Sequence, residues 1–169
     1  MKARFQTECG EFEIRLFLKE APRTAEYFRD LISKGALDGS YFFRIVCAAN
    51  ASMRKDNPIE VIQGGLREED PQPVPPIAHE PTSQTGLTHK KWTVSTARHG
   101  AGETFGSFFV CMRDEPELDF GGKRHPDGLG FAAFGEVVSG FETLDTIFSR
   151  YEPEEFVKKQ ILIEKCTLV

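Results

Sequence analysis

The fold is decided by the stretch TECGEFEIRLFL, residues 7–18. In this stretch the apolar residues Phe12, Ile14 and Leu16 alternate with charged ones, which is the two-residue period of a β-strand with one buried face. Phe5 lies on the other side of a turn that contains Gly10. A period of two on both sides of a glycine-containing turn predicts a β-hairpin near the start of the chain.

The period changes from strand to helix after Pro22. Apolar residues then recur at helical spacing and Gly35 suits a helix end, so the pattern predicts a helix over about residues 22–34. Further along, apolar runs predict strands at residues 41–46, 60–63, 92–97, 108–112, 134–138 and 160–169, and a second helix at 140–149.

The segment at residues 67–84 contains five prolines, which predicts irregular chain without a helix or a central strand. The predicted strands and helices do not alternate as they do in a doubly wound sheet. We therefore expect a mainly β protein, an antiparallel sheet or barrel covered by two helices, in one domain of residues 1–169.

The composition is that of a water-soluble globular protein. Of the 169 residues, 40% are hydrophobic and 28% are charged. A chain of this length buries about 69% of the surface that its unfolded form exposes, so its core needs neither a metal nor disulfides. The aromatic residues are 15 Phe against 3 Tyr and 1 Trp, a surplus without polar groups.

Charge and cysteine content exclude several classes of partner. The net charge of −5 comes from 21 basic and 26 acidic residues, which argues against nucleic acid as a ligand. No apolar run is long enough to cross a bilayer, so we expect no membrane partner and a cytoplasmic location. The four cysteines form no C-x-x-C pair, which predicts free thiols. The four histidines lack ligand spacing, so we expect solvated side chains, no metal and no cofactor.

Six short motifs resemble those of the cyclophilins, in the order in which that family carries them. They are TECGEFEIRL at residues 7–16, AP with Thr24, YFFRIV at 41–46, QGG at 63–65, FFV at 108–110, and LD at 118–119 with FAAFGEV at 131–137. The likeness runs from about residue 3 to residue 168, and six motifs in register are far more specific than one.

The resemblance implies an eight-stranded antiparallel β-barrel capped by two α-helices and the activity of a peptidyl-prolyl cis-trans isomerase. Such an enzyme would act on proline-containing peptides and on unfolded or folded proteins. Arg44 matches the catalytic arginine of the family and Gln63 the glutamine beside it. The apolar wall that receives the proline ring matches Val61, Phe109, Leu118 and Phe131. Ala97 and Arg98 match an Ala-Asn pair that binds the peptide backbone.

Several positions depart from the family pattern. Glu60 stands where an aromatic residue is usual, so a carboxylate is expected near the proline site and near Arg44. Ser107 replaces the glutamine before the Phe pair, and Glu117 replaces a tryptophan that favours cyclosporin, which predicts weak cyclosporin binding. Residues 45–62 hold roughly eleven residues more than the family spacing.

These departures leave a second interpretation open. The barrel could serve as a catalytically weak or inactive module that binds proline-containing segments or a partner protein. A third, an unrelated barrel that binds a small ligand, requires the motif register to be accidental.

Overall fold

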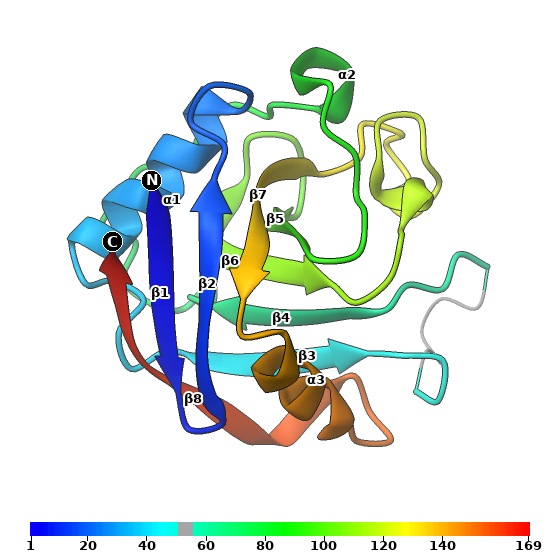
Figure 1. Cartoon of the computed structure of the whole chain (residues 1–169). Coiled ribbons are helices and arrows are strands. Elements are labelled where there is room, and N and C mark those ends of the chain that lie inside the picture. The colour runs from blue at the N-terminus through cyan, green and yellow to red at the C-terminus, as the bar shows by residue number, and fades with distance from the viewer. Residues whose placement is uncertain (51–55) are drawn as a thin grey trace.

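The computed structural model describes residues 1–50 and 56–169. Within these residues, eight antiparallel strands close into a barrel in the order β1-β2-β7-β5-β6-β4-β3-β8 (Figure 1). The strands are β1 (Lys2–Thr7), β2 (Gly10–Leu16), β3 (Tyr41–Val46), β4 (Val61–Gly65), β5 (Thr93–Arg98), β6 (Thr104–Cys111), β7 (Ala132–Ser139) and β8 (Phe156–Leu168). The predicted eight-stranded barrel is confirmed.

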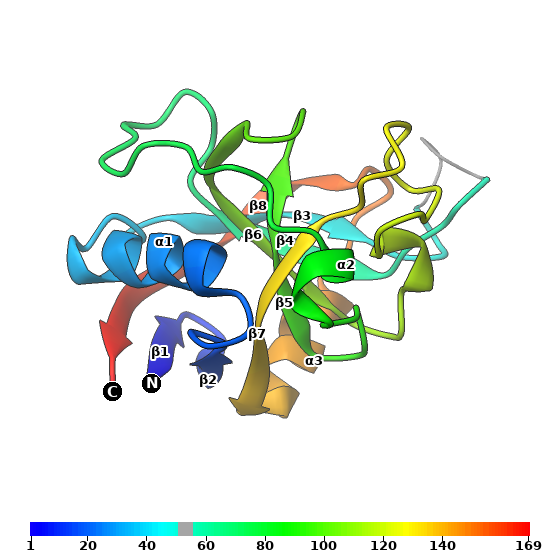
Figure 2. The ribbon, with the colours of Figure 1, turned by 90° about the horizontal axis from the view of Figure 1, so that it is seen from above.

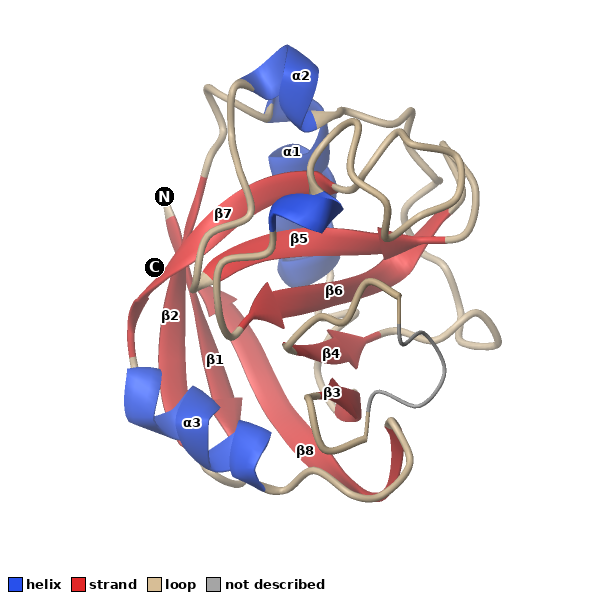
Figure 3. Ribbon diagram, turned by 90° about the vertical axis from the view of Figure 1, so that its right-hand side faces the viewer, coloured by secondary structure: helices blue, strands red, loops and turns tan. Residues whose placement is uncertain are grey.

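Two longer helices cover the barrel, as predicted. In Figures 1 and 3, α1 (Pro22–Ser33) lies toward one end of the barrel and α3 (Phe141–Ser149) toward the other. Each sends apolar side chains into the barrel core, including Phe28 and Leu31 from α1 and Leu144 and Ile147 from α3. In the described part of the chain, every helix is too short or too polar to span a membrane.

Several boundaries differ from the prediction, most of all the starts of β6 and β8. Strand β6 begins at Thr104, four residues before the predicted start at 108. Strand β8 begins at Phe156, four residues earlier than expected, because only Val157 is buried among its first four residues and no alternation of buried side chains marks the start. The proline-rich segment does contain helix, because α2 (Thr82–Thr85) begins directly after Pro81. A proline before the first turn removes no helical hydrogen bond, so it starts a helix as readily as it breaks one.

The phenylalanine surplus fills the barrel. Six of these side chains are less than 2% exposed: Phe5, Phe12, Phe28, Phe42, Phe108 and Phe134. The rings of Phe5 and Phe12 stack at 4.8 Å and those of Phe28 and Phe134 at 4.1 Å. Each buried ring contributes roughly 1.5–3 kcal/mol of hydrophobic free energy to the folded state. This contribution explains how the fold is stable although its four cysteines form no disulfide.

A second, smaller apolar cluster lies outside the barrel wall. This outer cluster consists of Val46, Ile59, Val61, Ala97, Phe109, Cys111 and Leu118, with Phe105 and Phe131 packed against it. It arises from strand alternation, since Phe108 belongs to the barrel core while the next residue, Phe109, belongs to the outer cluster. The outer cluster forms the floor on which the candidate site is built.

Candidate active site

A cavity of about 360 Å³ lies over the outer cluster. Its lining residues are Phe43, Arg44, Ile59, Val61, Gln63, Arg67, Glu68, Glu69, Ala97, Arg98, His99, Phe105, Phe109, Leu118, Arg124, Phe131 and Phe156. Eight of the ten predicted site residues are among them, and the exceptions are Glu60 and Ser107. One wall is therefore apolar and aromatic, while the polar side is dominated by guanidinium groups.

Strand pairing aligns the central residues of the site in one row. Arg44 of β3 is paired with Gln63 of β4, which is paired with Phe109 of β6, which is paired with Ser95 of β5. On the other side of β3, Arg44 is paired with Phe156 of β8. Residues 44, 63, 95, 109 and 156 thus become neighbours across five strands, because directly paired residues point to the same face of a sheet.

Arg44 is held from two sides. Its Nη1 donates to Oε1 of Gln63 at 3.2 Å, while Nε and Nη2 both donate to Oε2 of Glu155 at 3.1 and 2.6 Å. The Phe156 ring lies 5.3 Å from the guanidinium carbon. With 23% of its side chain exposed, Arg44 still faces the cavity.

Ser107 orients Gln63 rather than lining the cavity. Gln63 Nε2 donates to Ser107 Oγ at 2.9 Å, and Ser107 Oγ donates to the carbonyl of Gly64 at 3.3 Å. Ser107 is completely buried and does not line the cavity, so its predicted place in the substrate site stays a prediction. These hydrogen bonds fix the orientation of the Gln63 amide.

The apolar wall consists of an edge-to-face pair of aromatic rings packed against aliphatic side chains of the outer cluster. The rings of Phe109 and Phe131 lie 5.6 Å apart at 87°, a favourable geometry for aromatic pairs. Val61 and Leu118 are buried beside them in the outer cluster, and Ala97 adds its methyl group. These five residues enclose an apolar space next to the Arg44 guanidinium.

Behind Phe109 lies a buried polar network that sequence reasoning missed. The His89 ring stacks against Phe109 at 6.1 Å; its Nδ1 donates to Asp119 Oδ1 at 2.7 Å, and its Nε2 lies 2.9 Å from Ser95 Oγ. His89 is 1% exposed, so the expectation of a solvated histidine is wrong here. Ser95 is also fully buried, and the network supports Phe109 without opening to the cavity.

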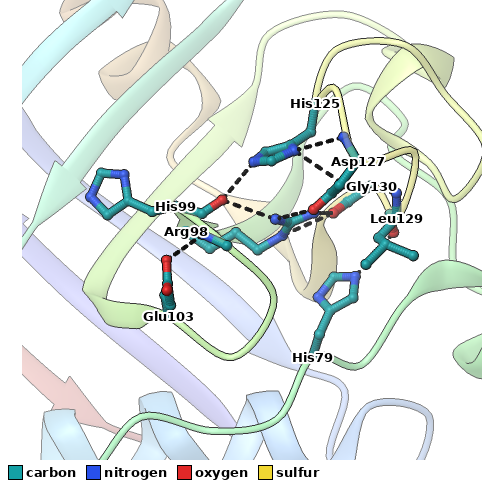
Figure 4. A network of polar contacts seen from close by, with 9 residues as sticks. His79, Arg98, His99, Glu103, His125, Asp127, Leu129 and Gly130 are labelled. Carbon is teal, nitrogen blue, oxygen red and sulfur yellow. Dashed lines mark hydrogen bonds and ion pairs between the residues drawn. The ribbon is translucent and has the colours of Figure 1, made fainter.

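Arg98 does not offer its donors to a peptide. Figure 4 shows its guanidinium enclosed by His99, Asp127 and Gly130. Nε and Nη2 donate to the Gly130 carbonyl at 3.1 and 2.6 Å, Nη1 and Nη2 donate to Asp127 at 2.9 and 3.0 Å, and Nη1 donates to the His99 carbonyl at 3.0 Å. These contacts use all five N–H donors of an arginine.

Arg98 instead fixes the loop that carries the aromatic wall. Gly130 has a φ of +65° and a Cβ there would lie 2.6 Å from the Asp119 backbone, so only glycine brings this carbonyl to Arg98. The next residue, Phe131, packs its ring 5.2 Å from the Arg98 guanidinium. The hydrogen bonds from Arg98 lower the pKa of Asp127 to about 2. That Arg98 binds the peptide, as its match to the Ala-Asn pair implies, stays a prediction, and the donors of its guanidinium are already used within the protein.

Glu60 is not the carboxylate beside Arg44. Ile59 and Val61 line the cavity, whereas Glu60, directly before β4, does not. The Glu60 carboxylate lies 3.8 Å from Arg113 instead. The carboxylate that pairs with Arg44 is Glu155, separated by 111 residues, and no local sequence pattern signals that contact. Part of the insertion at 45–62 lies outside the described residues.

Comparison with known proteins agrees with this architecture. The family model for cyclophilin type peptidyl-prolyl cis-trans isomerase/CLD matches residues 2–168. The chain is 30% identical over 145 residues to peptidyl-prolyl cis-trans isomerase cyp18 of Streptomyces antibioticus, covering 83% of this chain and 79% of that protein. It is 28% identical over 144 residues to peptidyl-prolyl cis-trans isomerase B of Escherichia coli, covering 85% and 81%.

A solved structure shows the same fold. The crystal structure of a cyclophilin type peptidyl-prolyl cis-trans isomerase from Cryptosporidium parvum, in the presence of the dipeptide Ala-Pro, matches with a TM-score of 0.79 at 18% identity. The match covers 100% of this chain and 99% of that chain.

The family match thus assigns this closed eight-stranded barrel, which carries an aromatic cavity on its outer wall, to the class of prolyl isomerases. The chain belongs to the family of cyclophilin-type peptidyl-prolyl cis-trans isomerases and is an enzyme of that kind. The resemblance seen in the six motifs is confirmed.

Proposed function

We propose that Arg44 is the catalytic donor of this isomerase and that the enzyme rotates exposed Xaa-Pro bonds of unfolded or folded proteins in the cytoplasm, which assists their folding. Residues 1–169 act as a single domain in this proposal. The observation that carries it is the placement of the Arg44 guanidinium at the edge of the apolar space formed by Val61, Phe109, Leu118 and Phe131.

The chemical problem is the barrier to rotation about the bond before proline. It stands at about 18–20 kcal/mol because the nitrogen lone pair is delocalised into the carbonyl. In the twisted state the lone pair is localised on nitrogen and can accept a hydrogen bond. Preferential binding of that state is enough for catalysis, and each 1.4 kcal/mol of such preference is worth about a factor of ten in rate.

Arg44 supplies this preference. Within the described residues, Gln63 and Glu155 take up three of its five N–H groups, and one hydrogen on Nη1 and one on Nη2 are left to meet a substrate. A guanidinium stays charged at any physiological pH and holds its donors in a rigid fork. The surrounding aromatic wall excludes water, which strengthens the hydrogen bond to the proline nitrogen.

The apolar wall holds the proline ring while the preceding residue swings. Phe109 and Phe131 line the cavity with their rings at 87° to each other, and Leu118 and Val61 line it beside them. Gln63 and Ala97 stand next to this space on neighbouring strands, where they can meet the substrate backbone. Glu117 accepts a hydrogen bond from the backbone N–H of Lys123 and lies outside the cavity lining, so we expect weak cyclosporin binding, measurable by calorimetric titration.

The test is cis-trans exchange of a labelled Xaa-Pro peptide, measured by NMR with wild type and Arg44→Ala. We expect wild type to accelerate exchange and Arg44→Ala to lose about 100-fold in kcat/KM, the size of effect seen when one preorganised donor is removed. Removing the arginine also strands the buried Glu155 carboxylate, so Arg44→Ala/Glu155→Ala serves as the folded control. Wild type that shifts peptide peaks without adding exchange would establish the pure binding module instead.

A further inference from the structure

We propose that Glu155 is a positioning residue for the isomerisation: it sets the direction in which Arg44 presents its free donors. The proposal rests on the proposed catalytic role of Arg44. It concerns a residue outside the six sequence motifs, brought to the site only by the pairing of β8 with β3.

The first observation is the environment of the Glu155 carboxylate. Its side chain is 1% exposed, and Oε2 accepts hydrogen bonds from both Nε and Nη2 of Arg44. The other oxygen, Oε1, is buried and has no hydrogen-bond partner among the described residues. Burying a carboxylate with one oxygen unpartnered costs free energy, so stability alone is a poor reason for a glutamate at this position.

The second observation is how firmly Glu155 is anchored. Its carbonyl accepts a hydrogen bond from the backbone N–H of Ile45 at 2.8 Å, directly next to Arg44 in β3. The following residue, Phe156, is paired with Arg44 across the strands. The glutamate is therefore attached to the same strand as the arginine that it holds, with little freedom to drift from it.

The third observation is that Glu155 and its surroundings constrain the guanidinium on three sides. Glu155 accepts a hydrogen bond from Nε and Gln63 accepts one from Nη1. The guanidinium carbon lies over the Phe156 ring, 5.3 Å from its centroid. Phe156 is itself held by stacking with Phe43 at 6.4 Å. Rotation of the guanidinium would break the two bonds to Glu155, so the free N–H groups point in one direction before substrate arrives.

Preorganisation of this kind acts on the transition state more than on binding. A donor that is already oriented pays no reorganisation cost when the lone pair localises, whereas the planar ground state gains little from it. We therefore expect a change at Glu155 to lower kcat and to leave KM nearly unchanged.

The experiment compares Glu155→Gln with the matched control Glu154→Gln, the exposed neighbour with the same charge. Exchange of a labelled Xaa-Pro peptide, measured by NMR across a titration, gives kcat and KM separately. We expect Glu155→Gln to lower kcat by at least about 10-fold with KM within about 2-fold, and Glu154→Gln to behave as wild type. The Arg44 Nε–H resonance reports the contact directly: it should be sharp in wild type and Glu154→Gln, and lost or shifted in Glu155→Gln.

Two outcomes for Glu155→Gln would overturn the proposal. One is a kcat for Glu155→Gln within 2-fold of wild type, and the other is a loss carried entirely by KM. A thermal unfolding scan guards against misfolding, and Glu155→Asp, which keeps the charge but not the reach, must also lose kcat. If Arg44→Ala keeps its activity, the proposed function fails. If Arg44→Ala is inactive while Glu155→Gln is normal, only the positioning role fails.

Discussion

Two adjacent phenylalanines, Phe108 and Phe109, lie in different environments. Phe108 contacts the rings of Phe5 and Phe42 inside the barrel, whereas Phe109 faces Phe131 and the cavity. The difference follows from the alternation of side chains along β6 and from nothing else in their chemistry. The same residue type thus serves stability at one position and the proposed substrate contact at the next.

Alanine at these two positions should separate stability from activity. Phe108→Ala is expected to lower the free energy of unfolding by about 3–5 kcal/mol, because it opens a cavity inside a packed core. Phe109→Ala is expected to cost only about 1–3 kcal/mol, since its ring already borders open space, yet to reduce kcat/KM at least 10-fold. Urea unfolding and peptide exchange measure the two effects. Equal stability losses at both positions would contradict the division.

At the scale of residues, the sequence predicts those site residues that lie in a recognisable motif on a single strand. Arg44, Gln63 and Phe109 are recognisable because each sits in a motif on its own strand, and the barrel then places them in one row. Glu155 and the Arg98 contacts are not recognisable, because their partners lie 111, 29 and 32 residues away. The prediction that Glu60 lies beside Arg44 is wrong, because its carboxylate lies near Arg113 and outside the cavity lining. The insertion before β4 makes the position of Glu60 hard to predict from the sequence.

At the scale of elements, the proline-rich segment is tied to α1 by a distant carboxylate. Glu80 accepts hydrogen bonds from the backbone N–H of Thr24 at 2.9 Å and from its hydroxyl at 2.8 Å, and from the backbone N–H of Arg23 at 3.3 Å. The residue before the helix, Ala21, makes no side-chain cap of its own. Figure 2 shows the segment between β4 and α2 arching over α1. The N-terminus of α1 is thus capped by Glu80 of the proline-rich segment, and the same hydrogen bonds attach that segment to the helix.

Removing the charge at this cap should loosen both elements together. Glu80→Gln is expected to lower the free energy of unfolding by about 1–2 kcal/mol, because a buried charge-assisted cap at a helix N-terminus is replaced by a weaker neutral one. Hydrogen exchange should increase in the first turn of α1 and in residues 66–81. Glu20→Gln, which removes an exposed carboxylate just before the helix, is the control. Unchanged exchange in Glu80→Gln would show that the cap is dispensable.

The loop between η1 (Pro116–Leu118) and β7 depends on Asp127 in a pH-dependent way. The pKa of Asp127 is about 2, below its ordinary value of 3.8, chiefly because Arg98 donates to the ionised form. A group whose pKa is lower in the folded state stabilises the fold above its unfolded pKa and loses that contribution as pH falls through the folded pKa. The stabilisation by Asp127 is therefore full above about pH 4 and disappears toward pH 2.

Urea unfolding of wild type and Asp127→Asn between pH 2 and pH 6 checks this expectation. Asp127→Asn should be less stable at pH 6, and the difference should shrink as the pH approaches 2, where the wild-type aspartate is protonated as well. A difference that stays constant over this range would show that the carboxylate charge is not the stabilising feature.

Elements were more predictable than their ends. The hairpin and both long helices follow from apolar periodicity, because each buries one continuous face. The start of β8 at Phe156 does not follow from this pattern, because Phe156 is exposed and Val157 is the one buried side chain among the first four residues of the strand.

At the scale of the whole molecule, closure is achieved by β8, which pairs with β1 on one side and with β3 on the other. The first and last strands of the chain thus lie side by side, as Figure 1 shows at the N and C ends. A closed barrel leaves no free strand edge to pair with another molecule. It also makes the outer row continuous from β8 through β3, β4 and β6 to β5.

That row has a consequence for the order in which the protein is made. Residue 44 is synthesised long before residues 155 and 156, so a growing chain carries the arginine before the carboxylate that binds it. Until β8 is made, the barrel stays open on one side and Glu155 cannot hold the guanidinium. If Arg44 and Glu155 have the proposed roles, an incomplete chain without β8 is therefore expected to lack full isomerase activity.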